Sequence, residues 1–164
     1  MAAGRGRGNG LCHVAARRPS ALVPDAMPAF DSPRPRPLVT PAQLDEALAA
    51  PVALVYKHSN RCPISLAAMQ EVDALLADRP DAPVWIVDVN VQRALSREVA
   101  DRTGVRHESP QAILLAHGEV LWNASHFDVR ADDLARELDA AVAAGAAAER
   151  GIDDGRGHTH GVLG

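Results

Sequence analysis

A single cysteine, Cys62, stands where an apolar segment meets a helix that begins with proline. The run His58-Ser59-Asn60-Arg61-Cys62-Pro63-Ile64-Ser65 follows the apolar residues 52–56. Backbone N–H groups of the first helical turn face a sulfur in this position, and the helix dipole favours negative charge there. Such positions lower the pKa of a cysteine from about 8.5 to roughly 3.5–7.5, which favours the thiolate that attacks disulfides. The sequence therefore predicts thiol chemistry at Cys62; the alternative is a small, buried cysteine that is inert.

Ser65 occupies the position at which a second cysteine would complete a Cys-x-x-Cys pair. Cys62 therefore has no neighbouring thiol, and its chemistry requires a mixed disulfide that an outside thiol resolves. Ser65 either hydrogen-bonds the sulfur of Cys62 or only caps the helix. The other cysteine, Cys12, lies in a segment without expected structure, and no zinc-type ligand spacing is present, so no metal site is predicted. We interpret His158 and His160 as solvated residues near the C-terminus.

Charge is distributed unevenly along the 164 residues, and this locates the folded domain. Residues 1–37 carry six arginines, two acidic residues and six of the twelve prolines, whereas residues 38–164 have a net charge of −8. We expect a disordered basic Pro/Arg-rich arm over residues 1–37, one folded domain over 38–144, and a flexible tail over 145–164. The arm fits a targeting peptide, a weak polyanion-binding segment or an extension without a fold, and we favour the last.

Composition also argues against several classes of function. The expected domain is acidic, which gives no electrostatic support for a nucleic-acid partner. No apolar run has the 7–15 residues of a secretory signal or the roughly 20 of a membrane span, so no membrane association is predicted. One cysteine in the domain argues against a disulfide-stapled secreted protein, and we expect a cytoplasmic location.

Apolar periodicity and turn residues predict an alternation of helices and strands. A strand–helix–strand unit requires a parallel pair, and a final hairpin around His117-Gly118 adds antiparallel strands. The fold class is therefore α/β, with a four-stranded mixed central sheet and helices on both faces, which is the layout of the thioredoxin fold. In that fold the active site follows the first central strand, as Cys62 does here. The predicted helices cover about residues 41–50, 63–78, 92–103 and 130–144, and the strands cover 52–57, 84–89, 112–116 and 119–122.

Two separated segments add a more specific likeness. The run 58–65 and the run Gly104-Val105-Arg106-His107-Glu108-Ser109-Pro110-Gln111 together resemble the monothiol bacilliredoxin family of thioredoxin-like proteins, over roughly residues 38–144. The resemblance implies removal of bacillithiol from mixed disulfides on client proteins, with Cys62 as the nucleophile. It implies no bound cofactor; bacillithiol is the thiol co-substrate, and a second low-molecular-weight thiol, a redoxin or a reductase regenerates Cys62.

The same resemblance suggests supporting roles around the cysteine. Pro110 matches the proline that thioredoxin-like folds hold in cis beside the active site, and the backbone of Ser109 would then present polar groups to the thiol ligand. Lys57, Arg61 and His107 would lower the energy of the thiolate and attract the acidic groups of bacillithiol. The alternative for these three side chains is an exposed charge without a partner.

Two other functions compete with thiol–disulfide exchange. The first is a redox-sensing or binding module that carries bacillithiol on Cys62 without turnover. The second is an iron–sulfur carrier, which we disfavour because the residues around Cys62 lack the Gly-Phe-Ser motif of that group.

Overall fold

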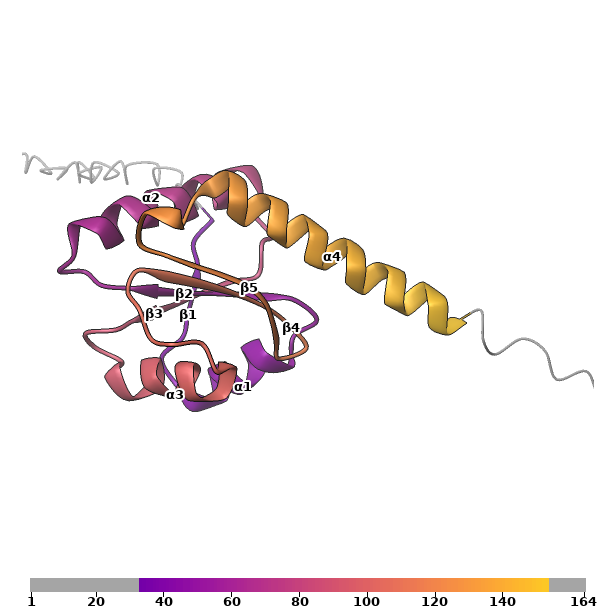
Figure 1. The fold of residues 1–164 in the computed structure, drawn as a ribbon, viewed down its shortest axis with the longest axis horizontal. Coiled ribbons are helices and arrows are strands. Elements are labelled where there is room, and N and C mark those ends of the chain that lie inside the picture. The colour runs from indigo at the N-terminus through magenta and orange to yellow at the C-terminus, as the bar shows by residue number, and fades with distance from the viewer. Residues whose placement is uncertain (1–32, 154–164) are drawn as a thin grey trace, which may run out of the picture. The chain divides into compact units, whose positions relative to one another are not determined.

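The computed structural model describes residues 33–153. Helices and strands alternate through this part of the chain, and most bounds agree with the predicted ones to within one or two residues (Figure 1). The elements are β1 (Arg36–Pro37), α1 (Pro41–Ala49), β2 (Ala53–His58), α2 (Pro63–Asp78), β3 (Val84–Asp88), α3 (Arg93–Thr103), β4 (Gln111–Ala116), β5 (Glu119–Ser125), a short 3₁₀ helix (His126–Asp128) and α4 (Ala131–Asp153).

The strands form one mixed sheet in the order β1-β3-β2-β4-β5. β2 pairs with β3 in parallel and with β4 in antiparallel orientation, and β5 pairs antiparallel with β4. The predicted α/β class with a mixed sheet is confirmed, but the sheet has five strands rather than four. The additional strand, β1, pairs in parallel with β3 through Arg36 and Pro37, which the sequence assigns to the arm. A two-residue edge strand that contains Pro37 has no periodicity to reveal it, and proline is tolerated at a sheet edge.

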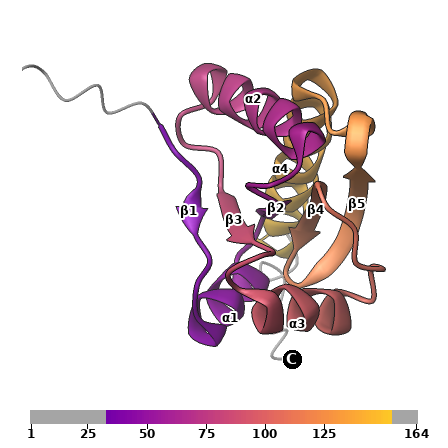
Figure 2. The same cartoon turned by 90° about the vertical axis from the view of Figure 1, so that its left-hand side faces the viewer.

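Helices cover both faces of the sheet, α2 and α4 one face and α1 and α3 the other (Figures 1 and 2). Alternate side chains of β2 enter opposite cores, as a strand requires. Leu54 and Tyr56 pack with α2 and α4, and Ala53 and Val55 pack with α1 and α3. Lys57 has the same parity as Val55, so its side chain belongs to the α1/α3 face. Cys62 therefore lies beyond the end of β2, at one end of the sheet, and the Lys57 side chain lies on the face opposite α2.

The starts and ends of the first helices follow local sequence signals. Thr40 and Gln43 form a capping box at α1, in which the Thr40 hydroxyl accepts from the Gln43 N–H and the Gln43 side chain accepts from the Thr40 N–H at 3.0 Å. Pro63 occupies the first position of α2. Gly104 ends α3 in the left-handed conformation, with φ +69°.

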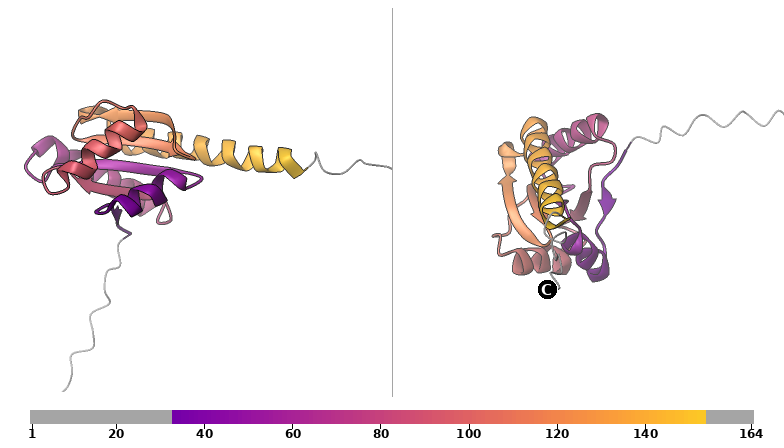
Figure 3. Two further views of the ribbon diagram at one scale, coloured as in Figure 1. Left: turned by 90° about the horizontal axis from the view of Figure 1, so that it is seen from below. Right: turned by 90° about the vertical axis from the view of Figure 1, so that its right-hand side faces the viewer.

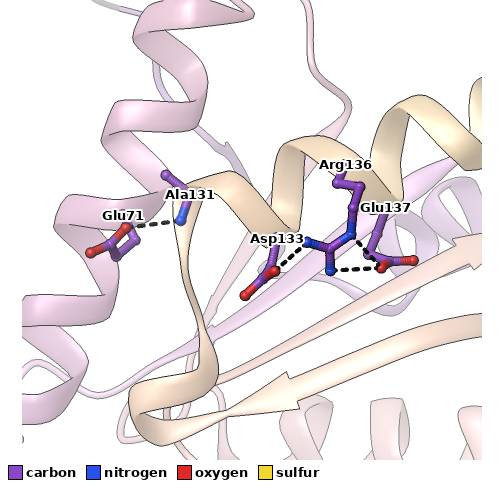
Figure 4. A network of polar contacts seen from close by, with 5 residues as sticks. All are labelled: Glu71, Ala131, Asp133, Arg136 and Glu137. Atoms are coloured by element: carbon purple, nitrogen blue, oxygen red, sulfur yellow. Dashed lines mark hydrogen bonds and ion pairs between the residues drawn. The ribbon is translucent and has the colours of Figure 1, made fainter.

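The first residue of helix α4 is hydrogen-bonded to a side chain of α2. The backbone N–H of Ala131 donates to a carboxylate oxygen of Glu71 at 2.8 Å, and Asp133, Arg136 and Glu137 form ion pairs along the first turns (Figure 4). The helix continues to Asp153, beyond the predicted end near residue 144, and extends past the edge of the sheet (Figure 3). Alanine has the highest helix propensity, and residues 140–148 contain seven alanines, so the helix persists without an apolar face to signal it.

These bounds change the predicted domain limits. The folded part includes β1 at its start and continues as helix beyond residue 144 at its end. The expectations for residues 1–32 and 154–164, including Cys12, His158 and His160, lie outside the described residues. No helix in the described part of the chain is long and apolar enough to span a membrane.

Candidate active site around Cys62

Cys62 is the N-cap of α2, immediately after the loop that follows β2. Its thiol is partly exposed and forms no disulfide. The backbone on either side is fixed, because the Cys62 N–H donates to the Ser59 carbonyl at 3.2 Å and the Cys62 carbonyl accepts from the Leu66 N–H at 3.1 Å. A rigid backbone and an accessible sulfur are what a nucleophilic cysteine needs.

Hydrogen bonds from the first turn of α2 lower the pKa of Cys62. The backbone N–H of Ser65 makes the largest contribution, and the N–H of Ile64 and the Ser65 hydroxyl add to it, while partial desolvation opposes them. These are the groups that a helix N-terminus directs at an anion. The first turn of α2 therefore favours the thiolate form of Cys62.

Ser65 is completely buried and links the loop to the helix. Its hydroxyl accepts from the Ser59 N–H at 3.2 Å, and its carbonyl accepts from the Tyr56 hydroxyl at 2.9 Å. The Ser65 hydroxyl also helps to lower the pKa of Cys62. Helix α2 has no side-chain cap hydrogen bond, so Ser65 fixes the loop through Ser59 and does not cap the helix.

An amide and carboxylate network holds the other side of the loop. Asn90 donates to the Ser59 hydroxyl at 2.9 Å and to the Asn60 side-chain oxygen at 3.2 Å, and Asn60 donates to Asp88 at 3.1 Å. Asp88 in turn accepts from the Asn90 N–H at 2.8 Å. The end of β3 therefore supports the loop that precedes Cys62.

Lys57 and His107 contact each other rather than the sulfur. The Lys57 amine is 0% exposed and lies 3.4 Å from Nδ1 of His107, and the Ser96 hydroxyl lies 3.5 Å from the same nitrogen. Burial lowers the pKa of Lys57 to about 8, although the charge of Asp101 opposes this. Burial also lowers the pKa of His107, and the nearby charges of Lys57 and Arg97 lower it further.

The predicted cations therefore differ in their positions. Lys57 is buried, whereas Arg61 and His107, which contacts the Lys57 amine, are both exposed. The lowered pKa of Cys62 comes from hydrogen bonds in α2 and not from a neighbouring cation. That Lys57, Arg61 and His107 lower the energy of the thiolate stays a prediction.

Ser109 and Pro110 are joined by a cis peptide bond, as the family resemblance implies. The Pro110 carbonyl accepts from the His126 N–H at 2.9 Å, which ties this segment to the end of β5. Gln111 is buried, and its side chain donates to the Arg106 carbonyl at 2.9 Å and accepts from the Glu108 N–H at 3.4 Å. The Ser109 hydroxyl is buried and has no hydrogen-bond partner within the described part of the chain.

Sequence reasoning missed the residues that position the site. Tyr56 is the only tyrosine of the chain and lies in an otherwise apolar strand, which could have suggested a buried hydroxyl with a fixed partner. Asn90 and Gln111 gave no such signal, because amides that follow or begin strands are common. In residues 33–153, no group of three or more His, Cys, Asp or Glu side chains is arranged to hold a metal ion.

Comparison with known proteins gives one family and one fold. The family model described as monothiol bacilliredoxin BrxC matches residues 36–134. A solved structure of a thioredoxin-fold protein, for which an oxidoreductase role has been suggested, is 34% identical with a TM-score of 0.59, and the match covers 62% of this chain and 91% of that protein.

Two thioredoxins share the fold at lower identity. A single-residue mutant of the thioredoxin from Halobacterium salinarum NRC-1 is 22% identical with a TM-score of 0.53, over 66% of this chain and 91% of that one. The thioredoxin from Trypanosoma brucei brucei is 10% identical with a TM-score of 0.57, over 70% of this chain and 96% of that one. These matches establish a thioredoxin fold.

Proposed function

The chain belongs to the monothiol bacilliredoxin family, and from this premise we propose that it removes bacillithiol from protein mixed disulfides through Cys62. The family and the thioredoxin fold support a redox function in general. The observation that carries the specific proposal is the N-cap position of Cys62, whose thiolate is stabilised by Ser65 and Ile64, with serine at the position of a second cysteine. One activated sulfur without a neighbouring thiol suits exchange with an outside thiol.

The reaction consists of two exchanges that balance in atoms and electrons. The Cys62 thiolate attacks the bacillithiol sulfur of the client disulfide; the client sulfur leaves as a thiolate and takes a proton from solvent. A Cys62–bacillithiol disulfide results. The thiolate of a second bacillithiol then attacks the bound bacillithiol sulfur, which gives oxidised bacillithiol and regenerates the Cys62 thiolate. A redoxin or a reductase is the alternative source of the two electrons.

The partners belong to the same proposal. They are bacillithiolated client proteins and bacillithiol itself, in a reducing cytoplasm where thiols persist. Lys57, Arg61, His107, Ser109 and Pro110 line or support the path of the thiol ligand, with Pro63 starting the helix that activates Cys62.

A turnover assay tests the proposal against a binding module. A bacillithiolated client is incubated with excess bacillithiol and a small molar fraction of the protein. Release of more than one equivalent of client thiol per Cys62 supports catalysis. A single equivalent, followed by a stable Cys62–bacillithiol adduct, overturns turnover and leaves a thiol-carrying module.

A further inference from the structure

A pocket of about 380 Å³ lies between α3 and the segment that leads to β4. Helix α3 contributes Arg97, Ala100 and Asp101, and the segment Gly104 to His107 forms the opposite wall. One residue of this wall, His107, also contacts the buried amine of Lys57. The pocket is thus separate from the Cys62 sulfur but joined to the cis-proline segment through His107.

The charges on the pocket wall are predominantly positive. Arg97 and Arg106 are exposed, and neither takes part in an ion pair within residues 33–153. Four other arginines of that range do form ion pairs: Arg79, Arg102, Arg130 and Arg136. Asp101 is the one acidic side chain on the wall, and its charge also acts on Lys57. Two unpaired guanidinium groups beside a concave surface are suited to bidentate contacts with carboxylates.

His107 connects this wall to the buried amine. Lys57 from β2 and Arg97 from α3 both disfavour a charged His107, whereas Glu108 favours it. Burial, and then these like charges, lower the pKa of His107, which favours the neutral imidazole whose Nδ1 can accept from the Lys57 amine at 3.4 Å. An anion on the wall would offset the repulsion and stabilise the protonated imidazole.

We propose that this pocket binds a small dicarboxylate, and that during thiol exchange the carboxylates are the acidic groups of the low-molecular-weight thiol. The first part stands on the pocket and its unpaired arginines. The second part rests on the proposed function. Binding would raise the pKa of His107. A protonated Nδ1 no longer accepts a hydrogen bond from the Lys57 amine, so occupancy of the pocket would affect Lys57.

A binding experiment on the full chain with Cys62→Ser tests the pocket without thiol chemistry. L-Malate is the dicarboxylate probe, and the ring signals of His107, assigned with a His107→Gln variant, are followed by NMR across a pH titration. We expect saturable binding and a higher pKa of His107 in the presence of malate. Arg97→Gln and Arg106→Gln should each weaken malate binding about tenfold or more, as expected for a bidentate charged contact.

Arg93→Gln is the matched control, because it removes the same charge from the same helix outside the pocket. It should leave malate binding unchanged. Absence of saturable malate binding, or an equal loss of malate affinity in Arg93→Gln, would contradict the proposed binding site. Neither result bears on the turnover assay, which measures client reduction by the chain that retains Cys62. Displacement of malate by reduced bacillithiol supports the assignment to the thiol; malate binding that bacillithiol leaves unchanged overturns that assignment.

Discussion

The hydroxyl of Tyr56 donates a hydrogen bond of 2.9 Å to the carbonyl oxygen of Ser65. This bond joins the centre of β2 to the first turn of α2, and Ser65 is the residue whose N–H and hydroxyl lower the pKa of Cys62. The strand therefore fixes the turn that stabilises the thiolate. Burial, together with the charges of Cys62 and Asp73, raises the pKa of Tyr56, so the hydroxyl stays protonated and remains a donor.

Replacement of Tyr56 by phenylalanine should lower the stability of the fold by about 1 kcal/mol, because it removes one buried hydrogen bond and keeps the ring. A urea titration measures this. His58→Ala, which removes the longer 3.5 Å contact to the same hydroxyl, is the control and should cost less in stability. An unchanged urea midpoint for Tyr56→Phe would show that the bond does not hold the turn in place.

Ser65→Ala should raise the pKa of Cys62 by about one unit or less while most activity remains. The hydroxyl is the smaller contributor beside the backbone N–H groups, and a hydrogen bond of about 0.5–1.5 kcal/mol corresponds to about one unit at most. The rate of iodoacetamide alkylation against pH reports the shift. Ser65→Thr retains a hydroxyl and should restore the lower pKa. If the alkylation profile of Ser65→Ala matched that of the unmodified chain, the Ser65 hydroxyl would not contribute to the stability of the thiolate.

Helix α2 was predicted with both bounds correct, whereas α4 and β1 were not. Pro63 and the prolines after residue 78 mark both ends of α2 in the sequence. The extension of α4 has no such stop signal, and its alanines carry helix propensity without apolar periodicity. The strand β1 forms by pairing with β3, which is distant in the sequence, so the residues around Arg36 and Pro37 alone do not predict it.

The position of Cys62 at the start of a helix was predictable from the sequence, but the side chains that support it were not. Cys62, Pro63 and Ser65 are close together in sequence, so their geometry follows from the helix they begin. The contact between Lys57 and His107 joins residues fifty positions apart and depends on strand parity and on the path of the segment after α3. Lysine is rarely buried, so its type alone predicts exposure.

The burial of Lys57 predicts a pH dependence of stability with a defined sign. Its pKa is about 8 in the folded chain and 10.5 as the reference value, so between these pH values the unfolded chain binds more protons than the folded chain. Stability should therefore rise with pH in this window, relative to Lys57→Met, by an amount on the order of 3 kcal/mol when integrated over it. Urea titrations of both chains from about pH 7 to about pH 9.5 measure the part of this rise that lies in that range. A constant difference across that range would contradict the burial of the amine.

Removal of β1 should destabilise the domain. A chain that begins at Leu38 lacks the pairing of Arg36 and Pro37 with β3 and the Arg36 guanidinium, which lies 5.6 Å from the Trp85 ring centroid. We expect a loss of about 1 kcal/mol and a fall in the thermal midpoint of roughly 4–8 °C compared with a chain that begins at Ser32. Arg36→Gln in the longer chain separates the cation–π contact from the strand pairing. Equal midpoints for the two truncated chains would restore the boundary after residue 37.

Cys62 should be the one residue whose sulfur the proposed chemistry requires. Cys62→Ser should abolish both adduct formation with oxidised bacillithiol and reduction of a bacillithiolated client, since serine does not form a mixed disulfide. Cys12→Ser is the matched control and should change neither. Intact-mass spectrometry of each variant shows whether it forms an adduct. In the unmodified chain, Cys62 should be alkylated by iodoacetamide with an apparent pKa below the value of about 8.5 for a free cysteine, because Ser65 and Ile64 stabilise the thiolate. A normal alkylation profile together with no adduct would leave Cys62 as a structural cysteine.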